Sequence, residues 1–143
     1  MEHAPIPHNE AERQGIITRM RIATFDAEPE LDRITSLAKR IFDVKSATMT
    51  VIDHDRQIFK SRANFEKLES RRDISFCGHA ITQTEPMVIK DARIDPRFSD
   101  NPLVICDTPV IFYAGMPVHH HEGQPVGTLC IFDDKPREMS QRD

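Results

Sequence analysis

The 143-residue sequence predicts one α+β domain built on an antiparallel sheet. Its length suits a single hydrophobic core. Apolar residues recur at helical spacing up to Val44 and alternate singly after Lys45. Segments with strand patterns then precede, flank and follow short helices, without the regular strand–helix alternation of a parallel sheet. A hydrophobic fraction of 38% and a charged fraction of 29% are compatible with a folded domain.

The first 24 residues predict a tail followed by a helix. Residues 1–9 hold two prolines and two histidines, and we expect a flexible tail. Residues 10–24 form a linker helix with one narrow apolar stripe: Ile16, Ile17, Met20 and Ala23. Because so thin a stripe suits docking on a neighbour, we expect a homodimer that forms through this helix.

A second, strongly amphipathic helix starts near Pro29, since the fixed φ of proline favours a first helical turn. Its apolar residues keep helical spacing: Leu31, Ile34, Leu37, Ala38, Ile41 and Phe42. Residues 47–52 then alternate as a half-buried strand, and residues 57–62 pair back as a second strand after a turn. Residues 63–74 form a charged connection.

Ser75 predicts the N-cap of a short helix that carries Phe76 and Cys77 and ends before Pro86. Residues 87–89 form a short strand. Residues 91–108 are rich in Asp, Pro and Asn, and predict a long ordered crossover with one helical turn. Loops of this length are commonly functional.

Two further strands are predicted at residues 110–119 and 125–132. The loop between them contains Gly123, which can take a positive φ in a hairpin turn. Together with the earlier strands, this gives a sheet of about five to six strands.

Charge and composition exclude several classes of protein. The net charge is −4, and Lys and Arg are scattered among acids, which argues against nucleic-acid binding. The basic pair Arg71 and Arg72 precedes Asp73 and predicts a solvated loop. No apolar run approaches the roughly 20 residues of a membrane span, and the first residues are not a secretory signal. The three cysteines Cys77, Cys106 and Cys130 fit free thiols in the cytoplasm.

Six ordered segments cover nearly the whole chain after the tail: 25–44, 55–61, 73–81, 90–104, 111–118 and 123–140. Together they resemble a GAF domain of the type found in bacterial diguanylate cyclases and sensor histidine kinases. The resemblance implies a central antiparallel sheet with helices on one face. The short helix and the crossover loop cover the other face and enclose a small-molecule pocket. Residues 25–143 would then be a GAF domain that lacks its C-terminal helix, within a longer multidomain protein; Ser140 would cap that helix.

The resemblance implies a non-catalytic, sensory domain that binds an unidentified small molecule and controls a diguanylate cyclase or histidine kinase. Candidate pocket residues come from the short helix, the crossover and the strand at 110–119: Phe76, Cys77, His79, Asp91, Arg97, Phe98, Asn101, Phe112, Tyr113 and Met116. Each also has a structural interpretation, either as core packing or as a residue that orders a loop.

Two alternatives stay open. A purely structural dimerisation module would carry the same residues around a collapsed pocket. Free methionine-(R)-sulfoxide reductases are GAF enzymes, and Cys77 and Cys106 resemble two of their cysteine positions; the third is absent, because residues 78–105 contain no cysteine. We therefore expect no catalytic residue. GAF domains that carry bilin place a histidine directly after the attaching cysteine. Here Gly78 separates Cys77 from His79, so a covalent bilin is not expected.

A run of His119, His120, His121 and Glu122 carries side chains that suit zinc or copper. Adjacent residues at a strand end point in alternating directions, so we expect them not to converge on one ion. The sequence therefore predicts a solvated hairpin tip and no metal site.

Overall fold

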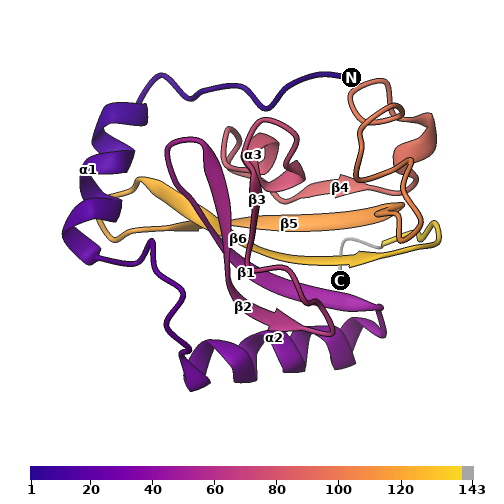
Figure 1. Cartoon of the computed structure of the whole chain (residues 1–143), viewed down its shortest axis with the longest axis horizontal. Helices are drawn as coiled ribbons and strands as arrows, with labels where there is room; N and C mark the ends of the chain where they lie inside the picture. The colour runs from indigo at the N-terminus through magenta and orange to yellow at the C-terminus, as the bar shows by residue number, and fades with distance from the viewer. Residues whose placement is uncertain (140–143) are drawn as a thin grey trace.

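The computed structural model describes residues 1–139 and shows one six-stranded antiparallel sheet with helices around it (Figure 1). The predicted fold class is confirmed. The strand order is β3-β2-β1-β6-β5-β4. The strands are β1 (Ser46–Ile52), β2 (Arg56–Ala63), β3 (Glu69–Arg71), β4 (Met87–Ile89), β5 (Phe112–His119) and β6 (Pro125–Asp133). The helices are α1 (Glu10–Met20), α2 (Pro29–Phe42), α3 (Phe76–Ala80) and the 3-10 turn η1 (Ala92–Ile94).

Two local signals explain elements around the site. The Ser75 hydroxyl accepts a hydrogen bond from the Gly78 backbone N–H at 2.9 Å, as the predicted N-cap of α3. Gly123 has a φ of 95° in the β5–β6 turn, as the hairpin requires. Strand β3 was missed, because three polar residues within a charged connection carry no apolar alternation. The predicted cap at Ser140 lies outside the described residues.

The two faces of the sheet are covered by different layers. Helix α2 packs across one face, against β1 and β2, while α3 and the crossover cover the other (Figure 1). Successive residues of β5 point to opposite faces: Phe112 packs in the cluster on the α2 side, and Tyr113 packs in the cluster under α3. The second cluster holds the candidate site.

Helix α2 docks through polar contacts and through Ala38 and Phe42, and it leaves much of its apolar stripe exposed. Thr35 is its one buried residue, and its Oγ1 lies 2.9 Å from Ser61 Oγ on β2. Ser61 in turn donates to Asp32 Oδ1 at 2.6 Å. Ile34, Leu37 and Ile41 are 42%, 58% and 65% exposed.

Helix α1 docks on its own chain. Ile16 and Ile17 pack with Val51, Ile58 and Val126 at one end of the sheet. Arg13 is fully buried and donates to the carbonyl oxygens of Ile52 at 2.6 Å and Pro125 at 3.3 Å. The apolar stripe that we expected to meet a neighbour is thus largely used within the chain.

The first residues contact the crossover and the segment around α3, and the basic pair departs in part from expectation. The tail runs along α3 towards the crossover (Figure 1), and Ala4 donates its backbone N–H to Asp73 O at 2.9 Å. Arg71 is solvated as predicted, but Arg72 is only 3% exposed, so that part of the prediction is wrong. The reason is a set of acceptors remote in sequence: the Glu10 carboxylate and the carbonyl oxygens of Asp53 and His54.

No helix among residues 1–139 is long and apolar enough to cross a membrane.

Candidate functional site

A cavity of about 90 Å³ lies on the α3 side of the sheet. The central strands form its floor, and α3, the β2–β3 connection and the end of the crossover form its walls. Its lining is mainly apolar and aromatic: Phe59, Phe65, Phe76, Leu103, Val110, Tyr113 and Phe132. All three cysteines also line it. Without rearrangement, such a volume admits only a small molecule.

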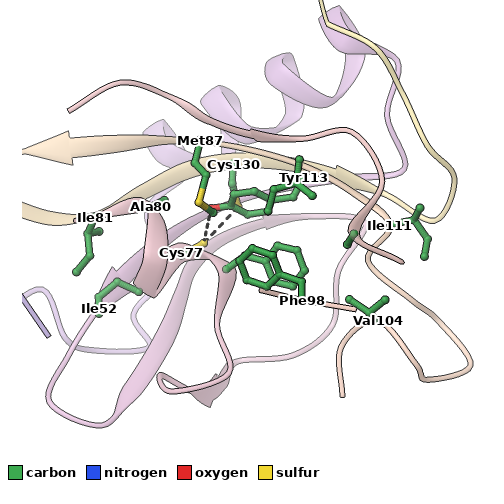
Figure 2. Close-up of a cluster of buried hydrophobic side chains, with 13 residues drawn as sticks. Ile52, Cys77, Ala80, Ile81, Met87, Phe98, Val104, Ile111, Tyr113 and Cys130 are labelled. Carbon is green, nitrogen blue, oxygen red and sulfur yellow. Dashed lines mark hydrogen bonds between the residues drawn. The ribbon is translucent and has the colours of Figure 1, made fainter. Parts of the chain in front are cut away.

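Two thiols and a phenol meet where α3 packs on the central strands. The Sγ atoms of Cys77 on α3 and Cys130 on β6 are 3.8 Å apart. The Tyr113 hydroxyl donates to Cys77 Sγ at 3.1 Å, and these side chains converge below α3 (Figure 2). On the other side, the Thr48 hydroxyl lies 3.0 Å from Cys130 Sγ. Cys77, Tyr113 and Cys130 are each at most 3% exposed.

This arrangement favours one negative charge on Cys77. Burial opposes ionisation, but hydrogen bonds from Cys130, Thr128 and Tyr113 outweigh it and lower the pKa of Cys77 to about 7. The hydrogen bond to Cys77, together with burial, raises the pKa of Cys130 well above its ordinary value. Burial and the charge of Cys77 likewise raise the pKa of Tyr113. Of these three groups, Cys77 is therefore the one that ionises most readily.

One polar group in the wall has an unused acceptor. Gln57 on β2 is 4% exposed, and its Nε2 donates to Ser70 Oγ at 3.0 Å. Its Oε1 has no hydrogen-bond partner within the described part of the chain. Since a buried acceptor without a partner costs free energy, Gln57 is suited to receive an N–H or O–H group from a ligand. Lys67, at the mouth, adds a positive charge.

Three of the predicted pocket residues line the cavity: Phe76, Cys77 and Tyr113. Phe98 and His79 lie behind them. Phe98 is fully buried and stacks on Phe76 with ring centroids 4.3 Å apart. The His79 ring meets the edge of Phe98 at 4.8 Å, and its Nε2 lies 3.2 Å from the carbonyl oxygen of Glu2. Burial lowers the pKa of His79, which fits a structural role.

The predicted residues of the crossover do not face the cavity. Asp91 caps η1 and pairs with Arg93, and Arg97 pairs with Asp95 at 2.9 Å. Asn101 is fully buried and donates to Ile74 O at 2.9 Å. These polar side chains order the loop itself. The crossover reaches the cavity through Cys106, which the sequence singled out only for the enzyme alternative, and through three residues that it did not single out: Leu103, Thr108 and Val110.

Two predicted residues of β5 also lie elsewhere. Phe112 is fully buried on the α2 side of the sheet, and Met116 is 47% exposed. Alternation along the strand puts both on the face opposite Tyr113. The pattern therefore divided these residues correctly but left open which face carries the pocket.

The remaining lining residues were missed because their sequence carried no distinguishing signal. Gln57 lies at the start of the predicted second strand, and Lys67 and Ser70 lie in the segment predicted as a charged connection. Thr48 and Cys130 sit on neighbouring central strands, where Thr48 pairs with Cys130 in register. Cys130 was noted only as a third free thiol.

The histidine run departs from its prediction. The ligand atoms of His120, His121 and Glu122 all lie within 4.8 Å of one another. The side chains converge because these residues occupy the hairpin turn, where strand alternation does not apply. His120 Nδ1 is 3.3 Å from Glu122 Oε2, and that carboxylate also pairs with Arg19 at 2.9 Å. The carboxylate is therefore already engaged.

The family model of the GAF domain matches residues 26–143. A cyclic di-GMP phosphodiesterase of Pseudomonas aeruginosa is 33% identical over 144 residues. That match takes in 100% of this chain but only 24% of the relative, so this chain spans about a quarter of the curated protein's length.

Solved structures share the fold at low sequence identity. The GAF domain of an Acinetobacter phosphoenolpyruvate-protein phosphotransferase superimposes with a TM-score of 0.62 at 13% identity, covering 92% of this chain and 81% of the other. A free methionine-R-sulfoxide reductase from Neisseria meningitidis, in complex with its substrate, gives 0.65 at 12% identity, covering 93% and 75%. A type II reductase from Thermoplasma acidophilum gives 0.64 at 16% identity, covering 80% and 79%. At these identities the likeness concerns the fold alone.

Proposed function

Because this chain belongs to the GAF domain family, we propose that it is the regulatory, small-molecule-binding domain of a signalling protein. The observation that carries the proposal is the cavity under α3, with the unused acceptor of Gln57 in its wall. The likeness to a cyclic di-GMP phosphodiesterase favours cyclic di-GMP turnover as the output of the whole protein. Three free cysteines favour a cytoplasmic location.

The lining restricts the ligand. A mainly apolar, aromatic wall favours a compact apolar body, and Gln57 favours an N–H or O–H group on it. Lys67 at the mouth favours an acidic group that stays near solvent. Small carboxylic acids and amino acids meet these requirements, whereas a dinucleotide is far too large for about 90 Å³.

Regulation requires that the ligand binds one conformation better than another. The cavity is bounded by two segments that a ligand would hold together: the β2–β3 connection, through Phe65 and Lys67, and the crossover, through Cys106 and Thr108. Both segments are connections between strands and not strands of the sheet. We propose that occupancy stabilises the closed arrangement of these two walls.

Native mass spectrometry of the purified chain, followed by thermal shift with small acids and amino acids, tests this proposal. Gln57→Met keeps the volume and removes the acceptor, so the affinity for a bound compound should fall about tenfold. Gln83→Met, at an exposed position, should leave it unchanged. A cavity that stays empty throughout, with identical behaviour of both variants, would favour the structural dimerisation module.

A specific observation keeps the enzyme alternative as a second candidate. Cys77 and Cys106, which resemble two cysteine positions of the free methionine sulfoxide reductases, line the same cavity. We propose that the domain itself is not catalytic, because the third cysteine position is empty. Incubation with free methionine-(R)-sulfoxide and a dithiol reductant decides between the two. Turnover that is lost in Cys106→Ser would establish the enzyme.

A further inference from the structure

We propose that Cys77 and Cys130 form a redox-active dithiol, which a small hydroperoxide oxidises to a disulfide within the chain. The proposal concerns the same cavity as the proposed function but does not rest on it. The two thiols would react whether or not the domain also binds another ligand.

The geometry brings together two sulfurs that are 53 residues apart in sequence. Cys77 lies on α3 and Cys130 on β6, and their Sγ atoms are 3.8 Å apart (Figure 2). A disulfide bond is about 2.05 Å long, so the sulfurs must approach by roughly 1.8 Å. Because α3 is a five-residue helix that packs directly on β6, a small movement of α3 with side-chain rotation can supply this approach.

The surroundings give the two thiols different roles. Tyr113 donates a hydrogen bond to Cys77 Sγ at 3.1 Å, and no carboxylate of residues 1–139 lines the cavity. The phenol reaches this position because Gly115, two residues on along β5, has no side chain; a Cβ at that position would overlap the Tyr113 hydroxyl. A thiolate is the nucleophile in thiol oxidation. Cys77 is therefore the attacking sulfur, and the protonated Cys130 is the resolving one.

The oxidation balances with a hydroperoxide as the sole oxidant. The Cys77 thiolate attacks the terminal oxygen of the peroxide, the O–O bond breaks, and the departing alkoxide or hydroxide takes a proton from solvent. Cys77 is then a sulfenic acid. The sulfur of Cys130 attacks it, the S–S bond forms, the S–O bond breaks, and the hydroxide leaves with the Cys130 proton as water. Two thiols supply the two electrons that reduce one peroxide.

The cavity selects the oxidant by size. Both thiols are nearly inaccessible from outside the cavity, at 3% and 2% exposure. About 90 Å³ of space admits hydrogen peroxide or a short alkyl hydroperoxide. A bulky disulfide such as oxidised glutathione does not fit. Cys106 differs, because it is exposed at the mouth and open to any reagent.

The test is to treat the intact chain with hydrogen peroxide, alkylate it in denaturant and map the peptides by mass spectrometry. The expected result is a linked pair of peptides that contain Cys77 and Cys130, formed equally in Cys106→Ser. Cys130→Ser should instead accumulate a sulfenic acid on Cys77 that dimedone traps. Oxidised glutathione should leave both buried thiols reduced.

The rate of disulfide formation gives a second readout. It should rise with pH through about 7, where Cys77 ionises, and Tyr113→Phe should slow it severalfold at pH 7 while the difference narrows at pH 9. A Cys77–Cys106 linkage, or equal and slow oxidation of all three thiols, would overturn the proposal. The peptide map of the oxidised wild-type chain tests the Cys77–Cys130 linkage without any variant, so it remains valid where a variant fails to fold. The result of this map is independent of whether the cavity also binds another ligand.

Discussion

Glu10 and Arg72 lie 62 residues apart in the sequence and are joined by two hydrogen bonds, of 2.6 and 2.8 Å. They connect α1 to the segment that leads into α3. Arg13 also donates to the same carboxylate, at 3.0 Å. Burial raises the pKa of Glu10, but hydrogen bonds from Arg72, Arg13 and Gln14 outweigh it and lower the pKa to about 2.

Replacing the charge of Glu10 should destabilise the fold. Glu10→Gln leaves two buried guanidinium groups without their carboxylate, and we expect the free energy of unfolding at pH 7 to fall by about 2–3 kcal/mol. Because the folded pKa is depressed, this stabilisation is complete above about pH 4.5 and is lost as the pH falls towards 2.

Urea unfolding across that pH range measures the effect. The wild-type chain should lose more stability than Glu10→Gln as the pH falls, so that the two curves converge. Glu30→Gln, on the exposed first turn of α2, is the matched control and should change stability little. Parallel curves for Glu10→Gln and wild type would show that the carboxylate contributes no such stabilisation.

The packing of α1 on the sheet predicts a second effect. Ile17 is 1% exposed, and Ile17→Ala should lower the free energy of unfolding by about 3 kcal/mol, through lost burial and a cavity. Met20 is 43% exposed, so Met20→Ala should cost well under 1 kcal/mol. If thermal or urea unfolding shows equally small losses of stability for the two variants, α1 is not docked as described.

Two glycines predict opposite outcomes for the same substitution. A Cβ on Gly127 of β6 would overlap the backbone oxygen of Thr50 on β1, so Gly127→Ala should force the central strands apart and cost about 3 kcal/mol or more. Gly15 in α1 has open space around its Cβ position, and Gly15→Ala should stabilise the helix by about 0.5–1 kcal/mol. The denaturant midpoints of the two variants, compared with that of the wild type, measure both effects. An unchanged midpoint for Gly127→Ala would contradict the close approach of β1 and β6.

Self-association through the N-terminal helix stays a prediction. The structure shows which residue of this helix is exposed enough to test it. Deleting residues 1–24 would also remove Ile16 and Ile17 from the core, so a point substitution is the better probe. Met20→Glu should weaken a dimer at least tenfold by light scattering, if α1 holds it. Leu37→Glu tests the exposed stripe of α2 instead. A dimer weakened by Leu37→Glu alone would move the interface to α2.

The sequence predicted the elements well and the site only in part, for reasons that particular residues make plain. Ser75 and Pro29 are local signals, so their helices begin where expected. Alternation separated Phe112 from Tyr113, but both positions are buried, and hydrophobic pattern alone does not say which layer encloses a cavity. Gln57 enters the site through the pairing of strands, which no local pattern encodes.

The same limit explains Arg72 and the histidine turn. Arg72 stands in a charged stretch, and its burial depends on Glu10 from another part of the chain. His120 and His121 were assigned strand geometry although they lie just beyond the strand end. In both cases the decisive information was a long-range contact or a turn conformation rather than residue type.

Arg72 also bears on how movement would travel through the domain. Its carbonyl oxygen accepts from the backbone N–H of Ser75 at 3.0 Å and from the Ser75 hydroxyl at 2.7 Å, at the start of α3. Its guanidinium holds Glu10 at the start of α1. Arg72 thus connects the start of α3, which forms a wall of the cavity, directly to the start of α1. Any tilt of α3 over an occupied or oxidised cavity would pull directly on α1.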